Sequence, residues 1–244
     1  MKGKLISVIT NIVLVAIVAT VSLVGFFGGR AVTVSNENSN IYYSAENGEG
    51  VSLMFNVYEN TENVYKILDI LDEYGAKSTF FIGGSWADDN VDCVREIFNR
   101  GHEIASHGYF HKDHSRMTLN ENLEEIRPSV KLLNMICNTN ITLFAPPSGA
   151  FCEATINACI SMDLRVIMWS RDTVDWRDKD VNLIVTRATK NLNFGEFVLM
   201  HPKDCSVAAL PKILTYIRDN GLNAVTVSQN LGEEWYILRL LTMD

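Results

Sequence analysis

The chain has 244 residues, of which 47% are hydrophobic, so it is long and apolar enough for one large folded domain or two small ones. It carries 29 acidic against 21 basic side chains, and this net charge of −8 argues against nucleic acid or an anionic lipid surface as a partner. Its five cysteines are odd in number and form no CxxC motif, which argues against a zinc cage and against a disulfide framework.

The first 30 residues form a segment of their own. Lys2 and Lys4 precede an uncharged run from Leu5 to Phe27, which is long enough to cross a bilayer as a helix. Because positively charged flanks stay in the cytoplasm, the rest of the chain would lie outside it. A cleaved signal peptide, which would leave a secreted protein, is the alternative. The apolar run is long for a signal peptide and no clear Ala-x-Ala site follows, so we expect an uncleaved, single-pass anchor in the cell membrane over residues 1–30.

Residues 31–50 are polar and predict a linker, in which the apolar stretch 41–43 packs on the domain that follows. The folded domain is expected over residues 51–230, and residues 231–244 form a C-terminal tail. Within the domain, short β-branched or aromatic runs alternate with longer stretches of helical period. Strands are predicted at Val51–Val57, Lys77–Gly83, His102–Ser106, Thr142–Ala145, Arg165–Ser170, Phe197–Met200 and Ala224–Val227. Helices are predicted near Glu62–Tyr74, Val91–Asn99, Asn120–Ile136, Glu153–Ser161, Val181–Asn191 and Ala208–Asn220.

Alternation of strands with helices requires parallel pairing through βαβ crossovers. We therefore expect an α/β fold, a distorted parallel (β/α) barrel of about seven strands that is closed or nearly closed. An open doubly wound sheet is the alternative. In such barrels the site lies at the carboxyl ends of the strands. Polar residues or turns follow the predicted strands at Asn56 to Glu59, His107 to His111, Pro146 to Gly149, Asp172 to Trp176 and His201.

Two of these residues, His107 and His111, are four positions apart. If the segment between them is helical, both imidazoles lie on one face, where they are able to share a metal ion. A solvated loop with unrelated histidines is the alternative. Trp86, Tyr109 and Trp169 are aromatic candidates for stacking on a sugar ring, although aromatic side chains more often lie in the core.

The motifs at the strand ends, taken in order, resemble those of the polysaccharide deacetylases that share the NodB homology domain, carbohydrate esterase family 4. That family carries Thr-Phe-Asp-Asp, His-x-x-x-His, Arg-x-Pro-x-Gly, Asp-x-x-Asp-Trp and Leu-x-His. This chain has Met54-Phe55-Asn56-Val57, His107…His111, Ala145-Pro146-Pro147-Ser148-Gly149, Asp172…Asp175-Trp176 and Leu199-Met200-His201. The resemblance covers residues 51–228, and an anchored form resembles the cell-envelope and sporulation-associated members.

The resemblance implies a hydrolase that removes N-acetyl groups from a cell-wall or related amino-sugar polymer. A divalent metal, usually zinc, is held there by two histidines and an aspartate and delivers a water to the acetamide. His107 and His111 match the metal ligands, and His201 matches the general acid that protonates the leaving amine. Asp175 matches the carboxylate that orients the base, and Asn56 stands at the position of the base itself.

Substrate contacts are expected from the loops beside these residues. Trp176 would wall the pocket next to Asp175. Pro147 would stiffen its loop, so that backbone N–H groups near Ser148 and Gly149 face the oxyanion.

Three positions depart from the family pattern. Asn56 replaces the base aspartate, and an amide accepts no proton near neutral pH. Val57 replaces the metal aspartate and has no ligand atom, and Ala145 replaces the arginine that tunes the base. These three losses are mutually consistent, because the arginine that tunes the base is absent together with the base. They indicate one altered site rather than three unrelated substitutions.

Two functions from different classes follow. In the first, the protein remains a metal-dependent deacetylase, in which Glu59, Asp113 or Asp172 completes the metal site, Asp175 acts as base and His114 is a weak substitute ligand. In the second, it is a pseudoenzyme that binds envelope glycan or a protein partner without hydrolysing it. A third possible function is that of a membrane scaffold, in which the polar residues at the strand ends are only solvated loop residues.

Overall fold

The computed structural model describes residues 40–232, so the predicted anchor, most of the predicted linker and most of the predicted tail lie outside the described residues. The strands are β1 (Ile41–Tyr42), β2 (Ser52–Val57), β3 (Thr79–Ile82), β4 (Glu103–Ser106), β5 (Leu143–Phe144), β6 (Arg165–Ile167), β7 (Arg171–Asp172) and β8 (Phe197–Met200). The α-helices are α2 (Thr61–Glu73), α3 (Gly84–Asp89), α4 (Val91–Asn99), α5 (Leu119–Cys137), α6 (Glu153–Ile160), α7 (Val181–Thr189), α8 (Asp204–Asp219) and α9 (Val227–Asn230). Two short 3-10 helices are η1 (His114–Arg116) and η2 (Pro147–Gly149).

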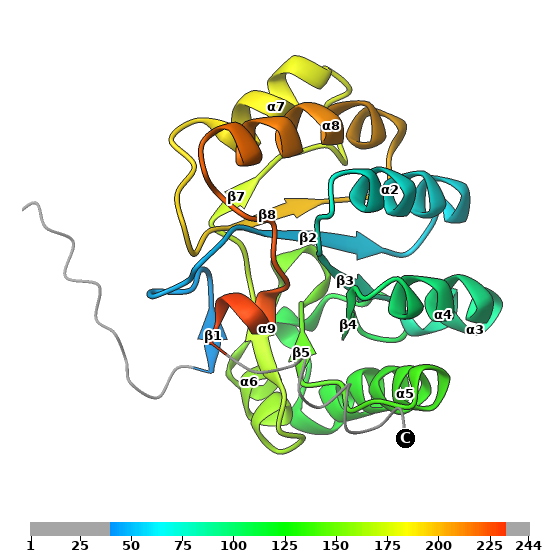
Figure 1. The fold of residues 1–244 in the computed structure, drawn as a ribbon. Helices are drawn as coiled ribbons and strands as arrows, with labels where there is room; N and C mark the ends of the chain where they lie inside the picture. The colour runs from blue at the N-terminus through cyan, green and yellow to red at the C-terminus, as the bar shows by residue number, and fades with distance from the viewer. Residues whose placement is uncertain (1–39, 233–244) are drawn as a thin grey trace, which may run out of the picture. The chain divides into compact units, whose positions relative to one another are not determined.

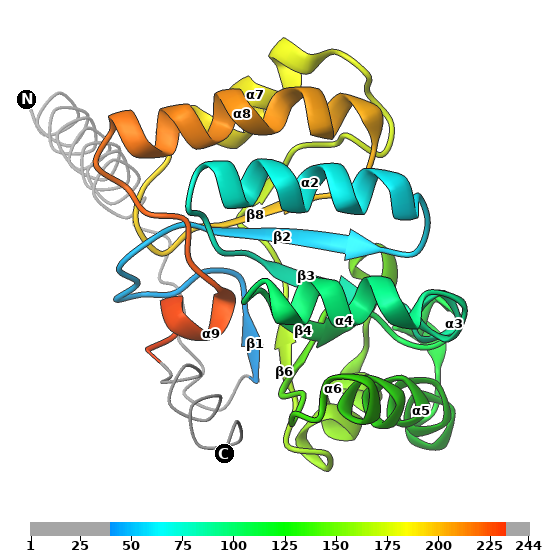
Figure 2. The ribbon, with the colours of Figure 1, turned by 45° about the vertical axis from the view of Figure 1, so that its right-hand side comes forward.

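All strands within residues 40–232 belong to one eight-stranded sheet in the order β1-β6-β5-β4-β3-β2-β8-β7, and each neighbouring pair is parallel. Figures 1 and 2 show the curled sheet with helices such as α2, α4 and α8 along its outer side. The order ends at β1 and β7, so the sheet is an open half-barrel. The predicted parallel α/β barrel is therefore confirmed in its class, and the expected number of about seven strands becomes eight. Among residues 40–232, no helix has the combined length and apolarity that crossing a membrane requires.

The central strand β2 lies between two of the three apolar cores of the described residues. Leu53, Phe55 and Val57 face outward and pack with the helices in the larger core. Met54 faces inward and belongs to the smaller core inside the half-barrel. Side chains of a strand alternate between its two faces, so Asn56 shares the inward face with Met54. This alternation decides which residues of β2 reach the functional site.

Part of the segment expected to be a linker belongs to the fold. Tyr42 and Ile41 form β1, which pairs with β6 at Ile167 and Val166. The sequence gives little signal for β1 or β7, because each is two residues long and shows no alternation. Helix α8 begins at Asp204, four residues before the expected start, because its first turn lacks the apolar spacing on which the prediction rested.

The predicted strand Ala224–Val227 is wrong. Ala224 forms only an isolated parallel bridge with Val51, and helix α9 begins at Val227. Thr226 caps this helix in a reciprocal pair with Gln229, so its backbone groups are not available for a ladder. The backbone N–H of Val227 donates to Thr79 Oγ1 (2.8 Å) and that of Ser228 donates to Glu103 Oε2 (3.2 Å). Since Thr79 and Glu103 begin β3 and β4, α9 covers the amino ends of the strands, opposite the site.

A substitution of Thr226 by valine distinguishes a cap from a strand. Valine is a good strand residue but accepts no hydrogen bond from Gln229, so Thr226→Val should lower the free energy of unfolding by about 1 kcal/mol. The control is Thr142→Val before β5, since the Thr142 hydroxyl forms no side-chain hydrogen bond with any residue that the structure describes. Urea unfolding measures both variants, and an unchanged or raised stability of Thr226→Val would contradict the cap.

Candidate functional site

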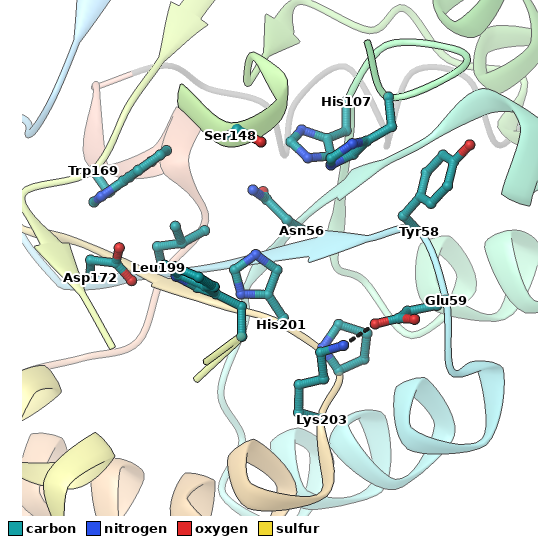
Figure 3. Close-up of a pocket in the computed structure, with 13 residues that line it drawn as sticks. Asn56, Tyr58, Glu59, His107, Ser148, Trp169, Asp172, Leu199, His201 and Lys203 are labelled. Carbon is teal, nitrogen blue, oxygen red and sulfur yellow. Dashed lines mark hydrogen bonds and ion pairs between the residues drawn. The ribbon is translucent and has the colours of Figure 1, made fainter. Parts of the chain in front are cut away.

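A cavity of about 540 Å³ opens at the carboxyl ends of the strands. Its walls come from segments that follow β2, β4, β5, β6, β7 and β8, as expected for a half-barrel of parallel strands. Figure 3 shows the labelled side chains Asn56, His107 and His201 turned toward one common space. The lining also includes His111, Tyr58, Glu59, Ser148, Trp169, Asp172, Trp176, Leu199, Pro202 and Lys203. The structure therefore brings the candidate histidines 107, 111 and 201 to one site.

His107 and His111 meet through a loop and not through a helix, so the expected helical spacing is wrong. Their ring centroids are 5.1 Å apart and the rings are nearly perpendicular. Gly108 (φ 74°) and His111 (φ 56°) adopt left-handed backbone conformations, which fold the loop back on itself. Tyr58 packs beside His111 with a ring-centroid distance of 5.0 Å. The pair is thus prearranged by backbone conformation.

Glu125 of α5 holds this loop from behind. Its carboxylate accepts from the backbone N–H of Phe110, and its backbone carbonyl accepts from Tyr109 N at 3.0 Å. Lys112 Nζ lies 3.7 Å from the same carboxylate, which is buried. One helical residue therefore anchors the segment between the two histidines.

His107 is buried and neutral. Its Nδ1 lies 2.8 Å from the carbonyl oxygen of Ala145. Because a carbonyl only accepts, Nδ1 carries the proton and Nε2 keeps its lone pair. Burial, reinforced by the nearby His111, lowers the pKa of His107 from 6.5 to about 3. Burial also lowers the pKa of His111.

His201 and Asp175 form a fixed pair on the other side of the cavity. Nδ1 of His201 and Oδ1 of Asp175 are 2.7 Å apart, and the backbone N–H of His201 donates to Oδ2 at 2.7 Å. Ser206 Oγ also donates to Oδ2, at 2.5 Å. With both oxygens engaged and the side chain buried, Asp175 orients His201. Because both of its oxygens are already bonded, Asp175 is not placed to act as the base, contrary to the expectation from the sequence.

Asn56 and Val57 lie on opposite faces of β2. Asn56 lines the cavity, is 6% exposed, and its Oδ1 has no hydrogen-bond partner among the described residues. Val57 is fully buried in the outer core. Ala145 is fully buried in the inner core, so no cation occupies the position of the family arginine. Of the three residues that depart from the family motifs, only Asn56 lines the cavity.

The residues present do not fit the metal set that the resemblance implies. Within residues 40–232, no three His, Cys, Asp or Glu side chains form a group able to hold a metal ion. Glu59 pairs with Lys203, and Asp172 Oδ1 accepts from Val174 N at 2.7 Å. Asp113 caps η1 by accepting from Ser115 and lies outside the cavity lining. None of the carboxylates proposed as a third ligand joins the two histidines.

His114, which the sequence offered as a weak substitute metal ligand, does not line the cavity either. It is fully buried, its Nδ1 lies 2.7 Å from Asn122 Oδ1, and its ring packs edge-on against Phe144. It belongs to the packing between η1, α5 and β5 rather than to the cavity.

Two of the four residues predicted to contact the substrate line the cavity, and the other two do not. Ser148 and Trp176 line the cavity, and Trp176 is 55% exposed. Pro147 is buried and Gly149 lies against Trp169, where a Cβ would come within 2.8 Å of the ring. The Gly149 N–H donates to Pro146 O, so it is not available to an oxyanion.

Of the three other aromatic residues predicted to stack on a sugar, only one lines the cavity. Trp169 lines the cavity, whereas Trp86 is a core residue. Tyr109 packs on Gly84 and donates to Asp88. Lys203 pairs with Glu59 at the cavity wall. The sequence does not identify it, because it belongs to no motif and only its position two residues after His201 indicates the site.

The depressed pKa of His107 has a consequence for stability. The unfolded chain takes up a proton on this imidazole near pH 6.5, whereas the folded chain does so only near pH 3, so acidification below pH 6.5 favours unfolding. Between pH 7.5 and pH 5, the wild type should lose on the order of 1 to 2 kcal/mol more stability than His107→Gln, which does not titrate. Urea unfolding in EDTA at both pH values measures the difference. Parallel pH profiles of the two proteins would show that His107 is not held neutral.

A family model for polysaccharide deacetylase matches residues 44–167. The Bacillus subtilis protein YlxY is 32% identical over 183 residues, which are 75% of this chain and 57% of YlxY, so the chain spans little more than half of that relative. A peptidoglycan-N-acetylglucosamine deacetylase of Bacillus cereus is 32% identical over 173 residues, 68% of this chain and 80% of that enzyme.

The fold has solved counterparts. A crystal structure of a carbohydrate esterase family 4 pseudoenzyme from Bacillus anthracis aligns with a TM-score of 0.75 and 26% identity, over 78% of this chain and 68% of that one. The family match, the relatives, the half-barrel and the motif order agree. The chain belongs to the polysaccharide deacetylase family.

Proposed function

We propose that the protein binds an amino-sugar polymer of the cell wall in the histidine cavity and does not hydrolyse it by the mechanism of its family. One observation carries this proposal: Asn56, which stands where the resemblance expects the base, lines the cavity and has no carboxylate to accept a proton. The outward direction of Val57 adds support, since the metal carboxylate has been replaced by a core side chain.

The cavity retains what binding a sugar requires. Tyr58, Trp169 and Trp176 provide aromatic surface on its walls, on which pyranose rings stack well. Asn56, Ser148 and the buried His107 supply neutral hydrogen-bonding groups. The relatives named as peptidoglycan deacetylases support a peptidoglycan-type glycan, and the Bacillus anthracis pseudoenzyme is a structural neighbour in the same family.

The second candidate is a residual deacetylase that requires a divalent metal. The intact pair of His201 and Asp175, at 2.7 Å, favours it because that pair is poised to hold and transfer a proton. His107 and His111 remain available at the opposite wall, although the described residues supply no third charged ligand. Acetate release decides between the two functions.

We further propose that residues 1–30 anchor the protein in the cell membrane and that the domain faces outside the cytoplasm, where it meets wall glycan. The uncharged run behind Lys2 and Lys4 supports this location.

Trp176→Ala tests the sugar platform. The exposed ring should contribute aromatic contact to the bound sugar, so its loss should weaken binding of an N-acetylglucosamine tetramer about three- to tenfold. Phe194→Ala is the matched control, because Phe194 is 54% exposed and lies outside the cavity lining. Calorimetry with the full chain in EDTA measures both. Equal affinities of the two variants would contradict the platform, and absence of binding by the wild type would contradict the proposed function.

Acetate release tests the absence of hydrolysis. The full chain with added Zn²⁺ should release no acetate from peptidoglycan fragments, and neither should Asn56→Asp, because position 57 still lacks a metal ligand. The deacetylase relative from Bacillus cereus serves as the positive control. Acetate release by the wild type that His201→Ala abolishes would instead establish the second candidate.

A further inference from the structure

A second cavity of about 570 Å³ adjoins the histidine cavity. Trp176 and Lys203 line both cavities, so these two side chains form the wall that the cavities share. Its remaining walls come from the start of α2, the loop between β7 and α7, and the first turn of α8. A polymer that places one sugar beside the histidines therefore meets the second cavity next, across the exposed Trp176 ring.

The second cavity carries three cations on a chain whose net charge is −8. They are Arg177, Lys179 and Lys203. The Arg177 guanidinium lies over the Trp176 ring at 5.6 Å from the centroid, which keeps its charge at the shared wall. Arg177 and Lys179 are exposed. Cations concentrated beside a binding site on an acidic protein favour a negatively charged ligand group.

The lining of the second cavity also contains the carboxylates of Asp175 and Asp204, and both accept hydrogen bonds from groups of the protein. Both oxygens of Asp175 are bound to His201 and Ser206, and Asp204 Oδ1 accepts from Asn63 Nδ2 at 2.9 Å. Asp178 is shared between Arg177 (3.0 Å) and Arg187 (2.7 Å).

The cations differ in how fully they are compensated. Lys203 pairs with Glu59. Lys179 forms no hydrogen bond or ion pair with any residue in the described range 40–232, so its charge is the one left for a ligand.

We propose that this second cavity is a subsite for a carboxylate carried by the sugar next to the one in the histidine cavity, so that the protein recognises an acidic amino-sugar polymer rather than a neutral one. The inference rests on the proposed glycan binding and names the class of glycan. Lys179 supplies the charge, and Trp176 supplies the surface along which the polymer passes from one cavity to the other.

Selectivity between matched tetrasaccharides tests the subsite. The acidic probe is a tetrasaccharide of alternating N-acetylglucosamine and N-acetylmuramic acid, and the neutral probe is the same molecule with its carboxyl groups amidated. The wild-type full chain should bind the acidic probe up to about fivefold more tightly, the range for an exposed ion pair. Raising the salt concentration should reduce this ratio because exposed charges are screened.

Lys179→Gln removes the charge while keeping much of the side-chain length. It should bring the ratio of the two dissociation constants to about two or less, whereas Lys190→Gln should leave it unchanged. Lys190 is an exposed lysine that lies outside the lining of both cavities and gives the same change of net charge.

The outcomes separate the two proposals. Equal affinities of the wild type for the acidic and the amidated probe, or an equal loss of selectivity in both lysine variants, would overturn the carboxylate subsite while leaving glycan binding intact. Tighter binding of an N-acetylglucosamine tetramer bearing phosphate than of the carboxylated probe would overturn the choice of carboxylate. Absence of binding to every probe would overturn the proposed function itself.

Discussion

The parallel pairing of β2 with β3 on one side and β8 on the other determines where the side chains of the site lie. It fixes Phe55 opposite Phe80 and Met200, and thereby fixes which face of the sheet each residue of β2 occupies. Because successive side chains point to opposite faces, Asn56 enters the cavity and Val57 enters the core. The carboxyl ends of the same strands bring His107 and His201 to one rim although they are far apart in the chain.

The electrostatics of the site follow from that placement. Burial holds His107 neutral and the carbonyl of Ala145 fixes its tautomer, while His201 is held by a buried carboxylate. The two walls thus differ: one presents a neutral histidine pair without a charged third partner, and the other an imidazole tied to Asp175. An amide at position 56 lies between them without the charge that the family chemistry uses. The arrangement favours binding over proton abstraction.

The binding function that we propose is compatible with an intact half-barrel. Val57 and Ala145, which stand where the resemblance expects a metal ligand and a cation, pack in the outer and the inner core respectively. The loop of His107 and His111 is meanwhile still anchored by buried Glu125. The exposed aromatic and basic residues of the β7–α7 loop extend the surface beyond the original cavity, where no core packing constrains them.

The sequence by itself determined the α/β class, the parallel pairing, most element positions and the residues at the strand ends, because hydrophobic period and motif order are local properties of the chain. Through the motif order it also placed Asn56, Val57 and Ala145 where the resemblance expects charged residues. Only the tertiary structure decided that Ala224–Val227 ends in a capped helix, that the two histidines meet through left-handed backbone, and that Asp175 is committed to His201. Those outcomes depend on contacts between segments distant in the chain, such as Val227 with Thr79 and Asp175 with Ser206, and on backbone angles that no residue period encodes.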